Sequence, residues 1–129
     1  MLDSVYSILL VDDHDDSREV AGEFLRLAGF EVTECGTAES ALESIGAKLV
    51  DLVVTDVMLP GMNGYDAASV LRSDARTARI PIVALTGHSM SDNPEQARLF
   101  DRVLVKPIEP YRLISAVKEL LDRRAGAAP

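Results

Sequence analysis

The sequence predicts an α/β fold in which a five-stranded parallel sheet is covered by helices on both faces. Two observations predict it: short apolar runs alternate with longer stretches of helical spacing, and the third run, Leu52-Val53-Val54, is apolar without interruption. An uninterrupted apolar strand suits a parallel sheet that is buried on both faces, and right-handed crossovers join such strands through helices. With 129 residues, the chain fits a single domain over residues 1–129, with a core from about 7 to 121.

The first half of the chain alternates strand, helix, strand, helix and strand. The first helix carries Val20, Phe24, Leu27 and Ala28 on one face, and Gly29 follows where a helix C-cap is expected. The second helix begins at Thr37, because threonine is a residue type that caps helix N-termini. The three strands are predicted at Ser7–Val11, Phe30–Glu34 and Leu49–Thr55.

The second half begins with a turn-rich loop, which is marked by Pro60-Gly61 and Asn63-Gly64. Asn93-Pro94 predicts the start of a helix that has only a few residues left before Asp101, so this helix is expected to be short. Residues 122–129 are expected to form a frayed tail. The remaining elements are a helix with Ala67, Ala68 and Leu71 facing inward, strands at Pro81–Leu85 and Arg102–Val105, and a last helix with the apolar stripe Leu113, Ile114, Val117, Leu120 and Leu121.

Composition and charge exclude several classes of protein. Hydrophobic residues make up 47% of the chain and charged residues 26%, which is typical of a globular domain rather than a disordered one. The net charge of −8 argues against nucleic acid or an anionic membrane as a direct partner, since both bind basic surfaces. No apolar run reaches the roughly 18 to 20 residues of a membrane span. Asp3 stands where a secretory signal would carry positive charge, and the lone Cys35 excludes an internal disulfide, so a cytoplasmic location is expected.

Polar side chains follow four of the predicted strands at the same edge of the sheet, where ligands of open α/β sheets bind. Asp12 and Asp13 follow the first strand, Asp56 follows the third, and Thr86 and Lys106 end the fourth and fifth. Two carboxylates about 4 Å apart repel each other by on the order of 4 kcal/mol at an effective dielectric constant near 20. A bound cation removes this repulsion, and oxygen ligands favour Mg²⁺ over Zn²⁺. The alternative is that Asp12 and Asp13 only cap the following helix.

A carboxylate beside a bound Mg²⁺ can accept a phosphoryl group, because such a transfer needs mainly positioning and charge neutralisation. Asp56 is the predicted nucleophile, since it lies centrally and follows the most apolar strand. Lys106 is predicted to neutralise one phosphoryl oxygen, and the Thr86 hydroxyl is predicted to donate to another. His14 is predicted to be a solvated loop residue rather than a ligand, since Mg²⁺ prefers oxygen.

The sequence resembles the response-regulator receiver domains of two-component signalling, and the resemblance extends from Ser7 to about Leu121. It implies a flavodoxin-like (βα)5 three-layer sandwich whose parallel strands have the order 2-1-3-4-5. The stretches that carry the resemblance are Ile8–Asp13, Asp56–Gly64, Pro81–Gly87 and Val105–Pro107.

For the acidic residues, the resemblance implies a phosphoacceptor and a metal site. Asp56 would take the phosphoryl group from a histidine kinase or a histidine phosphotransfer domain. Asp13 and Asp56 would ligate Mg²⁺ together with the backbone carbonyl of Met58, and Asp12 would assist through water. The chain would then be a signalling phosphoacceptor of a phosphorelay rather than an enzyme. Phosphorylation would switch its contacts with a downstream protein that the sequence does not name.

For the other strand ends, Thr86 and Lys106 take the positions of the family's signalling threonine and phosphate-binding lysine. The Lys106-Pro107 bond is expected to be cis, which is permissible because proline follows. Gly87 beside Thr86 leaves room for a phosphoryl group. Met58 and His88 flank the site at positions that tune the lifetime of the phosphoryl group in the family.

Two features depart from the family pattern. Val103 stands where the family usually carries an aromatic residue, so the usual coupling between threonine and aromatic residue cannot operate in its familiar form. The short helix before Asp101 alters the surface normally used for output. Phe100 offers an aromatic ring nearby, although phenylalanine at a helix end is more often part of the core. These departures leave open a degenerate receiver that binds proteins without phosphorylation, whereas the complete set of acids, threonine and lysine favours phosphorylation.

Overall fold

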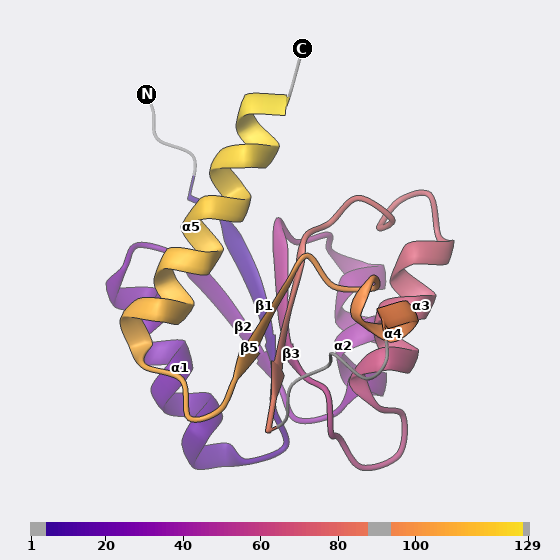
Figure 1. Cartoon of the computed structure of the whole chain (residues 1–129), viewed down its shortest axis with the longest axis horizontal. Coiled ribbons are helices and arrows are strands. Elements are labelled where there is room, and N and C mark those ends of the chain that lie inside the picture. Colours follow the sequence, from indigo (N-terminus) through magenta and orange to yellow (C-terminus); the bar gives the residue numbers. More distant parts are fainter. Residues whose placement is uncertain (1–4, 88–93, 128–129) are drawn as a thin grey trace.

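The computed structural model, which describes residues 5–87 and 94–127, confirms the predicted α/β fold. Five parallel strands form one sheet in the order β2-β1-β3-β4-β5, and helices cover both of its faces (Figure 1). The strands are β1 Ser7–Val11, β2 Glu31–Cys35, β3 Leu52–Asp56, β4 Ile82–Thr86 and β5 Arg102–Val105. The helices are α1 Asp15–Leu27, α2 Ala38–Ala47, α3 Gly64–Ser73, α4 Pro94–Ala97 and α5 Pro110–Ala127.

Local sequence signals place most element boundaries to within a residue. Thr37 caps α2 as predicted, because its Oγ1 accepts a hydrogen bond from the Ser40 backbone N–H at 3.1 Å. At the start of α3, Asn63 and Asp66 accept from each other's backbone N–H groups and form a capping box. Among the strands, the largest error is at β3, which begins three residues later than predicted. Leu49 is 46% exposed, so the apolar run begins before the residues that pair in the sheet.

The core consists of two apolar layers, one on each face of the sheet. One layer lies between the sheet and helices α1 and α5, where Leu25 and Val117 are fully buried. The other lies under α2 and α3 and includes Leu71 and Phe100, and Figure 1 shows these helices on the right of the sheet with α1 and α5 on the left. Full burial of each large apolar side chain contributes about 1.5 to 3 kcal/mol, so both faces of the sheet are tightly constrained.

The apolar face of α1 that the spacing identified points away from the sheet. Val20 is 53% exposed, Phe24 38% and Leu27 81%, whereas the residues that α1 buries are Gly22 and Leu25. Periodicity reports which residues share a face, but it does not report which face meets the sheet. The exposed stripe is therefore available to form a surface feature, which is described with the site below.

The last helix extends further than the sequence suggested. Helix α5 continues to Ala127, so residues 122–127 are helical and the frayed tail expected from residue 122 is not found there; residues 128 and 129 lie outside the described residues. Arg124 donates a hydrogen bond from Nη1 to the backbone carbonyl of Asp51 at 2.7 Å. In Figure 1 the end of α5 lies near the start of β1, at the edge of the sheet opposite the carboxyl ends of the strands.

Helix α4 is short, as predicted, and Arg72 of α3 binds the segment that follows it. Arg72, whose side chain is 24% exposed, pairs with Asp101 at 2.7 Å. Its guanidinium also donates to the backbone carbonyls of Leu99, Ala78 and Ile80 at 3.1, 2.9 and 2.8 Å. One arginine therefore joins the end of α3 to the segment before β4 and to the segment before β5.

The aromatic and apolar residues near α4 belong to the core. Phe100 is 7% exposed, and its ring centroid lies 5.9 Å from that of Tyr65 at the start of α3. Val103 on β5 is partly buried and packs against the same layer. The interpretation of Phe100 as a core residue is therefore confirmed. Among the described residues, no helix is long and apolar enough to cross a membrane.

Candidate functional site

The carboxyl ends of four strands bring the predicted site residues to one edge of the sheet. Asp12 and Asp13 follow β1, and Asp56 is the last residue of β3. Thr86 ends β4, and Lys106 directly follows β5. One carboxylate oxygen from each of the three aspartates lies within 4.8 Å of the others. Backbone pairing of β3 with its neighbours β1 and β4 fixes this arrangement, since the three strands end side by side.

Asp56 and Lys106 form the central ion pair of the site. The Lys106 Nζ atom lies 2.9 Å from Oδ1 of Asp56 and donates a hydrogen bond to Oδ2 at 3.0 Å. The position of the lysine is fixed by its backbone N–H, which donates to the Thr86 carbonyl at 2.7 Å. The Lys106-Pro107 peptide bond is cis, as predicted. A cation is therefore held within contact distance of both oxygens of the buried carboxylate.

The environment of Asp56 disfavours its negative charge. Asp56 is only 3% exposed to solvent. Burial is the largest cause of the change in the pKa of Asp56 and raises it, and contact with the Asp12 carboxyl group raises it further. Lys106 lowers the pKa by a smaller amount, and the net result is a pKa of about 7. Additional positive charge at the site would favour the ionised carboxylate, which is the form that a nucleophile needs.

One buried oxygen at this edge has no hydrogen bond, and a second has only an ion pair. Within the described residues, Oδ1 of Asp13 accepts no hydrogen bond, and Oδ1 of Asp56 is contacted by Lys106 Nζ at 2.9 Å without a hydrogen bond. A buried acceptor left without a partner costs about 1 to 3 kcal/mol, so such atoms need an explanation. An oxygen-ligated divalent cation supplies one, since it would contact the acceptors and offset the repulsion between the carboxylates. The residues present therefore fit Mg²⁺.

The competing interpretation, helix capping, accounts for little of this geometry. The N-cap residue of α1 is His14, and its side chain makes no capping hydrogen bond. Oδ1 of Asp12 accepts from the His14 backbone N–H at 2.9 Å, which forms a local turn before the helix. Asp15 and Asp16 occupy the first helical turn, where negative charge is favourable.

His14 has the exposure that was predicted for a solvated loop residue. Its side chain is 72% exposed, and its Nδ1 atom lies 3.3 Å from Oδ1 of Asp13. The nitrogen is close enough to the aspartates to join the group of possible ligand atoms. That the metal prefers the oxygens remains a prediction.

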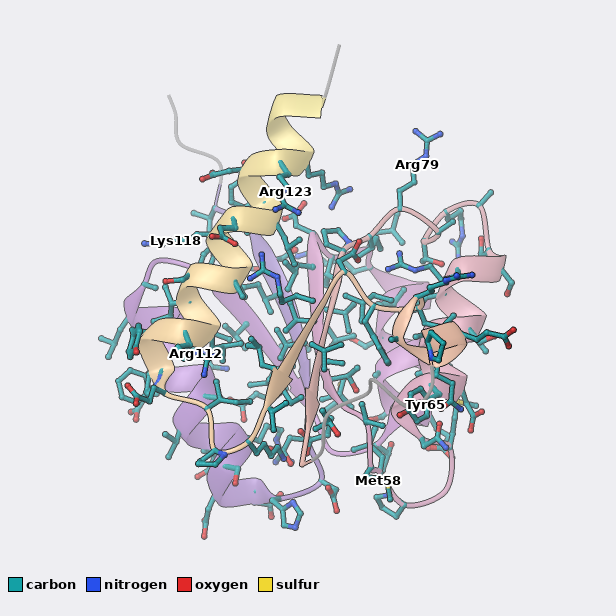
Figure 2. All side chains as sticks on the ribbon, viewed as in Figure 1. Met58, Tyr65, Arg79, Arg112, Lys118 and Arg123 are labelled. Carbon is teal, nitrogen blue, oxygen red and sulfur yellow. The ribbon has the colours of Figure 1, made fainter. Side chains whose placement is uncertain are left out.

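Met58 and His88 were predicted to flank the site. The Met58 side chain, two residues after Asp56, is 72% exposed, and Figure 2 shows it at the lower edge of the molecule. The role of its backbone carbonyl as a metal ligand stays a prediction. His88 lies outside the described residues.

Gly64 allows the start of α3 to approach Asp56. The Gly64 N–H donates to the Val57 carbonyl at 2.8 Å, and a Cβ atom added at this glycine would lie 2.4 Å from the Asp56 carbonyl oxygen. Real Cβ atoms do not come so close to backbone atoms, so a larger residue must displace either α3 or Asp56.

Gly64→Ala is therefore expected to lower the melting temperature by several degrees, which corresponds to about 1 to 3 kcal/mol of overpacking. Thermal unfolding followed by circular dichroism measures the change. Gly46→Ala is the matched control, because a Cβ at that helical glycine meets nothing within 4 Å. Equal melting temperatures for the two variants would contradict the prediction.

An apolar groove adjoins the site. It has a volume of about 720 Å³, and its lining includes Val20 and Phe24 from α1 together with Ile108 and Leu113 from the β5–α5 region. Asp12 and Lys106 line the same groove, so the groove and the acidic site share a boundary. The sequence analysis did not identify it, because a groove between helices depends on the direction in which the faces of α1 point.

Comparison with known proteins shows the family to which the chain belongs. The sequence model of the response regulator receiver domain family matches residues 8–118, which is most of the chain. The chain belongs to this family. The receiver is 36% identical over 122 residues to the phosphate regulon transcriptional regulatory protein PhoB of Pseudomonas aeruginosa, covering 93% of the chain and 53% of that protein. It thus spans about half the length of this relative.

Solved receiver structures share its fold. A response regulator from Chloroflexus aurantiacus is 34% identical with a TM-score of 0.86, and the match covers 92% of this receiver and 99% of that chain. The receiver domain of a sensor histidine kinase from Pseudomonas aeruginosa PAO1 is 26% identical with a TM-score of 0.84 over 92% of this receiver and 99% of that chain. That domain has a magnesium ion coordinated in its active-site cleft. Receivers as a family act as phosphoacceptors in signalling and bind Mg²⁺ at their acidic site.

Proposed function

We propose that this receiver accepts a phosphoryl group on Asp56 in a Mg²⁺-dependent reaction, and that the phosphorylated form changes its contacts with another protein. One observation carries the proposal. The buried Asp56 carboxylate lies against Lys106 and next to two further aspartates, and Oδ1 of Asp13 accepts no hydrogen bond within the described residues. A carboxylate in this position combines a nucleophilic oxygen with adjacent groups that can neutralise a phosphoryl group.

The chemistry follows from these positions. A carboxylate oxygen of Asp56 attacks the phosphorus of a phosphohistidine; the new P–O bond forms as the P–N bond breaks, and the electron pair of that bond goes to the imidazole nitrogen. Lys106 binds a phosphoryl oxygen, and the hydroxyl of Thr86 donates to another. Asp13, Asp56 and the Met58 carbonyl would hold Mg²⁺, with Asp12 acting through water. When bound, the ion supplies positive charge that stabilises the transferring group.

The proposal also includes the class of protein that donates the phosphoryl group. A histidine kinase or a histidine phosphotransfer domain must bring its phosphohistidine to the edge that carries Asp56. The groove lined by Phe24 and Ile108 offers an apolar contact surface beside that edge. The proposed downstream partner is a protein rather than nucleic acid. The chain carries a net charge of −8, whereas nucleic acid binds basic surfaces.

Incubation with acetyl phosphate tests the proposal. The intact mass of the wild-type receiver is expected to increase by one phosphoryl group in the presence of Mg²⁺, and to stay unchanged when EDTA replaces the metal. Asp56→Asn is expected to remain unmodified under both conditions, because it lacks the nucleophilic oxygen. A phosphorylated histidine phosphotransfer domain, used as the donor in a second arm, tests the proposed partner class.

The alternative function makes the opposite prediction. A degenerate receiver that only binds proteins would bind no phosphoryl group from either donor. Labelling that persists in Asp56→Asn would place the phosphoryl group on another residue, and so would reject Asp56 as the acceptor.

A further inference from the structure

Arg18 connects the loop that carries Asp12 and Asp13 to two neighbouring elements. Its Nη1 atom donates to the Asp12 backbone carbonyl at 2.8 Å. Nη2 donates to Asp15 in the first turn of α1 at 2.9 Å, and Nε donates to Glu34 on β2 at 3.3 Å. The Arg18 side chain is only 16% exposed. One guanidinium group thus donates hydrogen bonds to a backbone carbonyl and to two carboxylates on different elements.

The contact with the Asp12 carbonyl fixes the peptide plane between the two loop aspartates. The N–H group of Asp12 donates to the Cys35 carbonyl of β2 at 3.1 Å, and its carboxylate accepts from the His14 N–H at 2.9 Å. Because Arg18 donates to the Asp12 carbonyl, the backbone N–H, the backbone carbonyl and the carboxylate of Asp12 each have a hydrogen-bond partner. Rotation of this peptide plane would swing Asp13, the next residue, away from Asp56.

Glu34 holds the guanidinium in place from the other side. Its Oε1 receives Arg18, and its Oε2 pairs with Arg26 at 2.9 Å. Gly22 on α1 permits this packing, because a Cβ there would lie 2.8 Å from Oε2 of Glu34. The carboxylate is 19% exposed, so the pair is shielded from solvent more than an ordinary surface ion pair.

We propose that Arg18 is a positioning residue of the metal site, which orients the Asp12–Asp13 peptide so that Asp13 can bind Mg²⁺. This inference rests on the proposed function, since it concerns the same site. Arg18 touches neither the metal ligand atoms nor Asp56 in the contacts described, and it acts through the loop backbone. Groups that orient metal ligands in this way typically change metal affinity by about 10- to 100-fold when they are altered.

Arg18→Lys separates this role from the effect of charge. Removal of a positive charge near an acidic site would by itself favour Mg²⁺, whereas lysine keeps the charge and loses the planar fork that reaches three acceptors at once. The dissociation constant for Mg²⁺ alone is measured from amide shifts in an NMR titration of each protein. We expect Arg18→Lys to bind Mg²⁺ about tenfold more weakly than the wild type.

A metal-free measurement and a matched control accompany the titration. In EDTA, hydrogen exchange at the Asp12 and His14 amides is expected to accelerate in Arg18→Lys, because the loop loses its anchor. Arg102→Lys makes the same change in another strand-to-helix ion pair, between Arg102 and Glu119, and should leave the Mg²⁺ affinity unchanged. Glu34→Gln loosens the support of Arg18 and should weaken Mg²⁺ binding measurably, but by less than Arg18→Lys does.

Several outcomes overturn the inference. Equal Mg²⁺ affinity in Arg18→Lys and the wild type would do so, as would equal weakening in Arg18→Lys and Arg102→Lys. If Arg18→Lys fails to fold, Glu34→Gln decides: an unchanged affinity rejects the positioning role. A wild-type chain that binds no Mg²⁺ would reject both this inference and the metal-dependent function. Acetyl phosphate labelling of the wild type separates the two proposals in every other case.

Discussion

In EDTA at pH 8, Asp56→Asn is expected to increase the free energy of unfolding by as much as about 4 kcal/mol. The pKa of Asp56 is raised from 3.8 to about 7 in the folded chain, and each tenfold change in proton affinity corresponds to about 1.4 kcal/mol. The ionised carboxylate therefore destabilises the metal-free fold, and the neutral amide of asparagine removes that cost. A functional carboxylate that weakens its own fold is typical of sites that need a ligand.

The raised pKa of Asp56 also determines how the stability difference between Asp56→Asn and the wild type changes with pH. Between about pH 4 and pH 7 the folded chain keeps a proton on Asp56 that the unfolded chain releases. The folded state then binds more protons, so the stability of the wild type falls as the pH rises through this range. The advantage of Asp56→Asn is expected to be small near pH 4, to grow with pH, and to reach its full size above pH 7.

Urea denaturation at several pH values measures the difference. Asp122→Asn serves as the control, because it removes the same charge from an exposed position on α5 and tests whether lower net charge alone stabilises the chain. A gain for Asp56→Asn that is equal at pH 5 and pH 8, or a gain no larger than that of the control, would contradict the burial of charge as its cause.

Arg72→Ala is expected to lower the stability by about 3 kcal/mol, or the melting temperature by roughly 10 °C. The substitution removes the ion pair with Asp101 and the donors for three backbone carbonyls. The carbonyls before β4 and β5 then depend on water that must enter a partly buried position. Because the Arg72 side chain is 24% exposed, this value is smaller than the loss expected for a fully buried ion pair.

Arg79→Ala is the matched control for that experiment. Arg79 belongs to the segment between α3 and β4 whose carbonyls Arg72 binds, is exposed, and projects away from the body of the molecule in Figure 2. Its truncation is expected to change the melting temperature little, since surface substitutions usually stay within about 0.5 kcal/mol. Similar melting temperatures for the two variants would show that the Arg72 contacts do not hold the α4 region in place.

The sequence was sufficient for the fold and for the prediction that these polar residues meet at one edge of the sheet, because both depend on local patterns; their roles at that edge stay predictions. Apolar runs identified the strands, and the end of each strand identified Asp56, Thr86 and Lys106. Parallel strands that end at one edge then bring those residues together without further information. The Asp56–Lys106 contact of 2.9 Å is a consequence of that topology.

Features that depend on long side chains or on helix orientation could not be predicted in this way. Arg18 and Arg72 are arginines among many in the sequence, and only their conformations show that they bind backbone carbonyls. The direction of the Phe24 face on α1 depends on how the helix rotates against the sheet. The helical extension of α5 past residue 121 likewise depends on contacts, such as that of Arg124 with Asp51, between residues far apart in the chain.

The placement of β1 and α5 also affects how the molecule can be attached to a surface. The start of β1 and the end of α5 lie at the edge of the sheet opposite Asp56 (Figure 1). A tether or an affinity tag joined near either position would hold the molecule with its acidic edge facing the solvent. Immobilised protein should therefore present the edge that carries Asp56 to partners in solution without steric interference from the support.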